Sequence, residues 1–150
     1  MLVGAGLLWA VSRGGSPSFV SLTGADGRPL VVRASNVYVV HPSPYESGGR
    51  PLVRLHVLGL KVPLDVREDI THVLGLLGRD WVRFEGLGSW FGSSQSSIPV
   101  LVDVSRVITA DHSGMRRSSD SQQLTDIQLE GDYKIRVLEN LQMVSSLLGR

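Results

Sequence analysis

The chain has 150 residues, of which 42% are hydrophobic and none is cysteine, and its formal net charge is +1. This length suits one domain or two small ones, and the hydrophobic content is sufficient for a packed core. The balanced charge excludes a global field that would draw the protein to nucleic acid or to an anionic membrane. The missing cysteines exclude both a disulfide framework and a thiolate nucleophile.

Residues 1–11 are apolar, and a segment rich in arginine, glycine and serine follows them. A secretory signal places basic residues before its apolar run, and a membrane span needs about 20 apolar residues. Because neither requirement is met, we predict that residues 1–17 form an N-terminal arm or an extra strand. A signal or anchor is the alternative.

Residues 18–78 are predicted to form a first β-rich unit. Alternating apolar residues lead into Asp26-Gly27, a dipeptide typical of tight hairpin turns. Two β-branched runs then lie on either side of a bend at residues 34–36. The segment that follows, residues 42–51, is predicted to be a plain loop.

The first unit is predicted to end with a hairpin and a helix. Residues 52–66 alternate between apolar and polar on both sides of Gly59, which indicates a hairpin with one solvated face. Apolar residues at helical spacing then predict a helix over residues 66–77. Asp65 is its expected N-cap, acidic side chains occupy its first turn, and Gly78 follows its end.

Residues 79–150 are predicted to form a second unit, because a stretch of the first unit returns in them at a constant offset of 70 positions. The repeated residues are Pro29, Val32, Ser35 and Val37, which return as Pro99, Val102, Ser105 and Val107. A duplication of the first unit accounts for this agreement. The alternative is a single β-sandwich whose strands are alike because strands generally resemble one another.

The rest of the second unit follows the same order of elements. Residues 112–123 are polar and are predicted to form a loop, and a hairpin is expected to turn at Gly131-Asp132. An apolar stripe then predicts a closing helix over residues 137–148, with Gly149 in the place that Gly78 holds in the first unit.

These patterns together predict an α+β fold. We expect two tandem units of mostly antiparallel strands, each closed by one C-terminal helix, that pack with pseudo-twofold symmetry into one globule.

No catalytic or metal-binding constellation is apparent in the sequence. The four histidines are His41, His56, His72 and His112. They are expected at a loop edge, on a strand, on a helix and at a loop edge, without a pair at ligand spacing or a nearby carboxylate cluster. The segment 86–92 is glycine-rich but lacks the strand, the spacing and the helix of a phosphate-binding loop, and we interpret it as a flexible hairpin tip. We therefore expect no metal, no cofactor and no enzymatic activity.

Aromatic residues in loops are the best candidates for contact with a protein partner. Trp90 and Phe91 lie between glycine and serine residues, and large aromatics in such a loop are costly to leave in water unless they dock against something. Tyr45 lies in the matching loop of the first unit. The alternative is that these side chains fold back onto the sheet of their own chain.

Arginines in the same loops are candidates for binding a small anion. Arg116 and Arg117, with Arg50 on the matching loop of the first unit, carry guanidinium groups that suit phosphate and carboxylate. The alternative is that they are solvated surface residues.

The pattern SLTGADGRPLVVRASNVYVV followed by VRLHVLGLKVPLDVREDITHVLGLL resembles the small flagellar FlbD/SwrD-type proteins. In both, a turn glycine, a short strand pair, a glycine hairpin and an acidic-to-apolar helix follow one another. The residues that carry the resemblance are Gly27, Val37, Gly59, Val66 and Glu68. It implies a small non-catalytic module that acts through contacts.

We therefore expect a non-enzymatic interaction or assembly protein, either an accessory or a structural module of a bacterium or phage. It would act through loop tips and sheet edges, form a homo-oligomer or bind another protein, and be cytoplasmic or virion-associated. The alternative is a small-ligand or nucleotide-binding module whose pockets lie at an oligomer interface.

Overall fold

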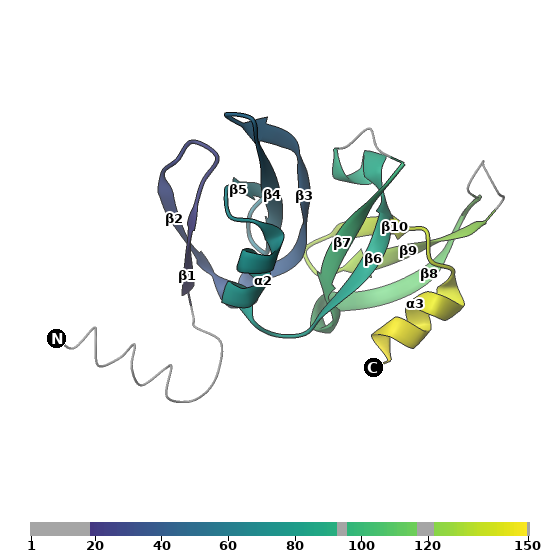
Figure 1. The fold of residues 1–150 in the computed structure, drawn as a ribbon. Coiled ribbons are helices and arrows are strands. Elements are labelled where there is room, and N and C mark those ends of the chain that lie inside the picture. The colour runs from purple at the N-terminus through teal and green to yellow at the C-terminus, as the bar shows by residue number, and fades with distance from the viewer. Residues whose placement is uncertain (1–18, 93–95, 117–121, 150) are drawn as a thin grey trace.

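The computed structural model describes residues 19–92, 96–116 and 122–149, and the predicted α+β class is confirmed (Figure 1). The strands are β1 (Phe19–Thr23), β2 (Pro29–Arg33), β3 (Val37–Ser47), β4 (Arg50–Val57), β5 (Leu64–Val66), β6 (Trp81–Leu87), β7 (Ser97–Asp103), β8 (Val107–Arg116), β9 (Gln123–Leu129) and β10 (Tyr133–Val137). The helices are α2 (Ile70–Leu77) and α3 (Leu141–Leu148). Short 3₁₀ turns are η1 (Ala34–Asn36), η2 (Gly88–Phe91) and η3 (Val104–Arg106).

The strands pair antiparallel and form mainly one sheet. Eight of them follow the order β5-β4-β3-β7-β6-β10-β9-β8, and β1 and β2 form a separate two-stranded sheet. A single bridge between Gly24 and Val66 connects the end of β1 to β5. Figure 1 shows the elements up to α2 on one side of the molecule and those from β6 onward on the other.

This pairing does not show the predicted pair of tandem units about a pseudo-twofold axis. A twofold axis repeats every contact between the halves, so under the predicted correspondence a β3–β7 pair would be matched by a β8–β2 pair. Here β3, the long strand of the first half, pairs with β7, the second strand of the second half, but β8 does not pair with β2. Because of this contact the eight-stranded sheet continues through both halves. The expected boundary at residue 78 is not a break in it.

Turn chemistry explains the hairpins, including one that the sequence analysis missed. Strands β1 and β2 join through Gly27, and β9 and β10 join through Gly131, as predicted; both glycines have positive φ. Residues 42–51 are not a plain loop, because β3 continues to Ser47 and β4 begins at Arg50. Between them Gly48 and Gly49 have φ of 59° and 77°, which is the backbone that a two-residue hairpin turn requires.

Both helices begin later than predicted. Asp69 caps α2, with its carboxylate accepting from the backbone N–H of His72 at 2.8 Å, and Asn140 caps α3 in the same way. Asp65 is therefore not the cap, as it lies in β5 and pairs with Arg54. The residues before each cap continue the sheet, which delays the helix by about one turn.

The predicted polar loop at residues 112–123 is shorter than expected. Strand β8 extends to Arg116, and β9 begins at Gln123. The predicted arm, residues 1–17, lies outside the described residues. Within the described part of the chain, no helix is long and apolar enough to cross a membrane.

Two apolar clusters form the core. Cluster one is built mainly from the first half and includes Val40, Leu55, Val66, Val73 and Leu77. Cluster two is built mainly from the second half and includes Phe84, Val100, Ile127, Ile135 and Val144. Helix α2 closes cluster one and α3 closes cluster two, as the apolar stripes predict.

Candidate interaction surface

The two halves meet where β3 pairs with β7. Val39 lies opposite Val102 and Val40 lies opposite Leu101. Val39 belongs to cluster two of the second half, whereas Leu101 packs against cluster one of the first half. Each half therefore contributes a side chain to the core of the other. We call this strand pair, with the side chains packed around it, the junction.

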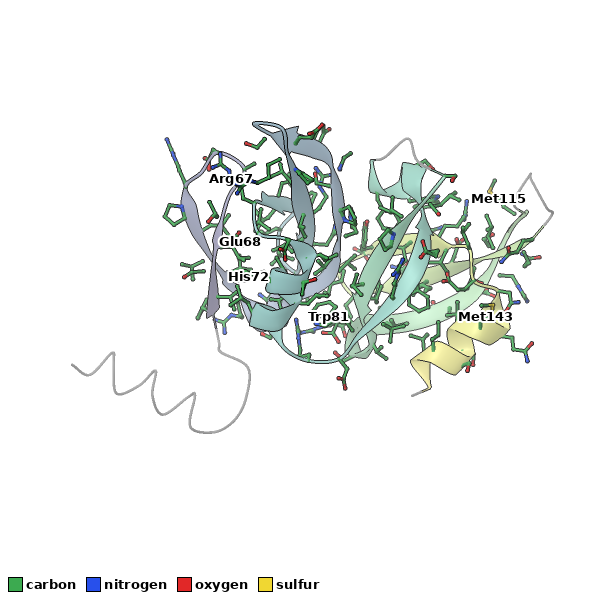
Figure 2. The ribbon with its side chains drawn as sticks, in the orientation of Figure 1. Arg67, Glu68, His72, Trp81, Met115 and Met143 are labelled. Atoms are coloured by element: carbon green, nitrogen blue, oxygen red, sulfur yellow. The ribbon has the colours of Figure 1, made fainter. Side chains whose placement is uncertain are left out.

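Second-half aromatic residues extend the junction away from the strand pair. Trp81 packs against cluster one, and its indole N–H donates to the carbonyl of Gly78 at 2.8 Å. In Figure 2 it lies below α2, where the chain passes between the halves. Tyr133 stacks on His56 with ring centroids 4.4 Å apart, and meets the ring of Tyr38 edge-on at 6.1 Å.

Arg79 holds the segment that links the halves. Its guanidinium donates to the carbonyl oxygens of Ala34 and Val37, each at 2.9 Å, and to the carboxylate of Asp103 at 3.0 Å. It also lies over the Trp81 ring. Since Asp103 ends β7 and Val37 begins β3, this one side chain fixes the register between the two strands.

Two histidines meet within the junction. The Nε2 atoms of His41 on β3 and His56 on β4 are 2.8 Å apart, and Nδ1 of His41 is 2.7 Å from the carbonyl oxygen of Pro42. A carbonyl oxygen only accepts, so Nδ1 of His41 carries the hydrogen, and Nε2 of the neutral ring accepts. His56 then donates through its own Nε2. The Phe91 ring packs against His41, with its centroid 4.7 Å from that of the imidazole.

Burial keeps both imidazoles neutral. It lowers the pKa of His41 to about 4 and, together with the neighbouring His41 and Arg54, the pKa of His56 to about 3. Among the residues that the structure describes, no group of three or more His, Cys, Asp or Glu side chains could hold a metal ion. Both neutral rings pack in the junction, His41 against Phe91 and His56 against Tyr133.

A cavity of about 400 Å³ opens beside the histidines. Both halves line it, and its polar or flexible contributors are Tyr38, His56, Lys61, Gly131, Asp132 and Tyr133. Burial raises the pKa of both tyrosines, so their hydroxyl groups remain protonated and available as donors.

Strands β2 and β8 each have one side without a strand partner among the described residues. Strand β2 pairs only with β1, and β8 pairs only with β9. Unpaired backbone N–H and C=O groups on such edges are a template for another strand. We call these two sides the β2 edge and the β8 edge.

The side chains on these edges correspond in position to side chains of the junction. We call two residues counterparts when they occupy the same place in the strand pairing of the two halves. Val31 is the counterpart of Leu101, and Ile108 that of Tyr38, in both cases 70 positions apart. Val31 is 65% exposed and Ile108 60% exposed, whereas Tyr38 is buried in the junction.

Two further exposed hydrophobic residues follow the same rule. Phe19 pairs with Arg33 as Trp81 pairs with Asp103, so Phe19 is the counterpart of Trp81. Val62 lies two residues before β5 and is aligned with Tyr133 by sequence alone, 71 positions apart. Both are exposed, whereas Trp81 and Tyr133 pack in the junction. The apolar side chains that join the halves internally thus have exposed counterparts at the ends of the molecule.

The polar contacts that hold each half together also have counterparts. Glu68 accepts from the backbone N–H of Thr23 at 2.9 Å, and Glu139 accepts from that of Glu85 at 3.0 Å. Both carboxylates precede a helix cap and hold the first strand of their half. Figure 2 shows Glu68 beside α2.

An ion pair occupies corresponding positions with its charges exchanged. Arg54 on β4 binds Asp65 on β5 at 2.8 Å, and Asp126 on β9 binds Arg136 on β10 at 2.7 Å. All four residues are cross-strand neighbours in their hairpins. The two hairpins therefore hold the ion pair in opposite orientations.

The structure separates the three aromatic residues that we predicted as partner contacts. Phe91 is 3% exposed and belongs to cluster two, so its own chain covers it. Trp90 is 37% exposed, and Arg136 lies over its ring. Tyr45 is exposed on β3, with Arg54 over its ring. Partner binding by Trp90 and Tyr45 stays a prediction.

The predicted anion-binding arginines are not seen together. Arg50 lines a second cavity of about 430 Å³, with Arg67, Asp69 and Ile70 among its neighbours. Arg116 is the last residue of β8, and Arg117 lies outside the described residues.

Sequence reasoning expected contacts through sheet edges without naming the strands, and it missed the histidine pair. His41 was placed at a loop edge because residues 42–51 were interpreted as a loop. The Gly48-Gly49 dipeptide is the signal that could have joined β3 to β4 and placed His41 and His56 on adjacent strands.

Comparisons with known proteins identify no relative of this chain. No family model, no curated protein and no solved structure matches it.

Proposed function

We propose that this chain is a non-enzymatic assembly protein that binds other protein chains, its own copies first, through the edges of its sheet. The observation that carries the proposal is the junction: β3 and β7 pair inside the chain, while the strands at the corresponding positions, β8 and β2, each have one side without a strand partner among the described residues.

The proposal includes an internal duplication of one strand-rich unit. The recurring carboxylate contacts of Glu68 and Glu139, and the ion pairs with exchanged charges, support it. So does the strand order, because β2-β1-β5-β4-β3, with the Gly24 bridge to Val66 included, corresponds to β7-β6-β10-β9-β8. A duplicated unit that binds its twin inside the chain presents the same binding surfaces again at both ends.

Exposed apolar side chains beside a free strand edge favour binding of protein over binding of a polar ligand. Val31 and Ile108 each lie on a free edge and project apolar surface into water. An edge of this kind supplies backbone hydrogen bonds, and the apolar side chains supply burial when a strand is added.

Sedimentation velocity over a concentration series tests the proposal. The wild-type chain is expected to form species larger than a monomer, in proportions that rise with concentration. Ile108→Lys places a charge on the β8 edge and is expected to shift the protein to monomer. Met143→Lys is the matched control. Met143 is 50% exposed on α3, and His72, which occupies the equivalent position on α2, stays exposed beside the junction. A contact between copies that resembles the junction should therefore leave Met143 uncovered. A wild-type chain that stays monomeric at every concentration would contradict the proposal.

A second candidate function is binding of a small ligand in the cavity between the halves. Tyr38, Tyr133 and His56 all line this cavity, and the Tyr133 hydroxyl lies 3.4 Å from Nε2 of His56, which favours it. Mass spectrometry of the purified protein under native conditions tests this function directly. A bound molecule that is lost in Tyr133→Phe would support it, and a chain of the mass of the protein alone would not.

A further inference from the structure

We propose that copies of this chain join head to tail, with the β8 edge of one copy pairing with the β2 edge of the next in the register that β3 and β7 use at the junction. This inference rests on the proposed function, since it names the partner and the geometry of the same edges.

The junction supplies the expected register. Within the chain, Val39 lies opposite Val102 and Val40 opposite Leu101. The counterparts of the β3 residues lie 70 positions later, and those of the β7 residues lie 70 positions earlier. Replacing each residue by its counterpart places Thr109 of one copy opposite Val32 of the next, and Ala110 opposite Val31. Both strands run in the direction that an antiparallel pair requires, because their counterparts do.

The apolar side chains at the two ends are complementary in the same way. At the junction, Trp81 and Leu101 of the second half pack against the first half, and Tyr38 of the first half packs in cluster two. Head-to-tail pairing would bring their exposed counterparts together: the β8 surface of one copy, which carries Ile108, would meet Phe19 and Val31 of the next.

This geometry favours head-to-tail pairing over pairing of like edges. The junction is heterologous, since β3 and β7 are different strands of their halves and neither pairs with its own counterpart. Repeating a heterologous contact generates a ring if the rotation closes and a filament if it does not. The sheet would then continue from copy to copy as it continues through the two halves.

The contact between copies is expected to be weaker than the junction. The loop that carries Phe91 covers His41 at the junction, but the β1–β2 turn, residues 24–28, is much shorter and has no aromatic side chain. Asp111, the counterpart of His41, would therefore remain solvated. Association should depend on concentration.

Engineered cysteines test the pairing in the full chain, which has no cysteine of its own. One preparation carries Val31→Cys and a second carries Ala110→Cys. Facing residues of antiparallel strands have Cα atoms about 4.5–5.5 Å apart, which lies within the disulfide range. Under mild oxidation the mixture is expected to give several-fold more disulfide-linked dimer than either preparation alone. A chain carrying both substitutions is expected to give a ladder of multimers.

The control mixture combines Val31→Cys with Met143→Cys and is expected to give no more dimer than either chain alone. Dimers that form equally well from Ala110→Cys alone would show pairing of like edges and overturn the head-to-tail geometry. The head-to-tail geometry is also overturned if no disulfide forms although the wild-type chain still sediments as an oligomer. In both cases the proposed function stands. A wild-type chain that is monomeric in sedimentation would overturn both proposals.

Discussion

His41 and His56 hydrogen-bond to each other through their Nε2 atoms at 2.8 Å, and both rings are neutral because burial lowers their pKa values to about 4 and about 3. The pair lies at the junction between the halves, beneath Phe91 and beside Tyr133. The stability of the junction is therefore linked to pH.

We expect acid to destabilise the protein between pH 6.5 and 4. An unfolded histidine titrates near pH 6.5, so in this window the unfolded chain binds more protons than the folded one, and the free energy of unfolding falls as the pH falls. The stabilisation is complete above about pH 6.5 and is lost as the pH approaches the folded values of His41 and His56. Melting curves from pH 8 to pH 4 measure the effect, which should be on the order of 3 kcal/mol.

The variant His56→Gln separates this effect from the titration of carboxylates. Glutamine can still donate to Nε2 of His41, and glutamine occupies the corresponding position on β9, Gln128. Its melting temperature should fall less between pH 7 and pH 4.5 than that of the wild type. An identical fall in both proteins would show that the histidines do not cause it.

Gly86 has no room for a side chain, and we expect Gly86→Ala to destabilise the fold. A Cβ atom there would lie 2.3 Å from Cε2 of Phe91 and 2.7 Å from Cγ2 of Val100, both in cluster two. Overpacking of this kind costs about 1–3 kcal/mol, measured by denaturant unfolding. Gly75→Ala is the control, because Gly75 lies in α2 and the added methyl would meet no atom within 4 Å beyond its chain neighbours and the backbone of its own helix. That change should stabilise the helix by up to about 1 kcal/mol.

Trp90 and Phe91 are neighbours in sequence but should respond differently to truncation. Phe91→Ala removes a buried ring from cluster two and is expected to cost about 3–5 kcal/mol of stability. Trp90→Ala removes a partly exposed ring that contacts Arg136 and Lys134, and should cost about 1 kcal/mol, the value of exposed cation–π contacts. Equal losses for the two variants in thermal unfolding would place Trp90 in the core as well.

The two ion pairs with exchanged charges predict that Arg54 and Asp65 can trade places. Asp65→Asn leaves the mostly buried guanidinium of Arg54 without its partner and is expected to cost about 2 kcal/mol. The double variant Arg54→Asp with Asp65→Arg reproduces the arrangement of Asp126 and Arg136 and should recover most of that loss. Urea unfolding of the three proteins measures it, and a double variant less stable than Asp65→Asn would refute the exchange.

Turns and helices could be predicted because their signals are local. Asp26-Gly27 and Gly131-Asp132 supply the backbone angles that tight turns need, and both turn hairpins in the structure. Apolar spacing placed α2 and α3 correctly, although the caps moved each start by one turn. The Gly48-Gly49 turn was missed because the prolines and polar residues around it are equally typical of a loop.

Strand partners could not be predicted from the sequence, and they decide the candidate site. Val39 and Val102 are 63 positions apart. Strand β8 has a pattern of β-branched residues similar to that of β3, so β7 could equally have paired with it, and β3 could in the same way have paired with β2. Only the packed structure shows which edges are used and which are left free, and only it buries Phe91 while leaving Trp90 at the surface. The sequence by itself determined the hairpins at Gly27 and Gly131 and the two helices, because these depend on backbone angles and periodicity within a few residues. The tertiary structure alone decided the junction, the histidine pair and the free edges, because these depend on competition between similar surfaces far apart in the chain.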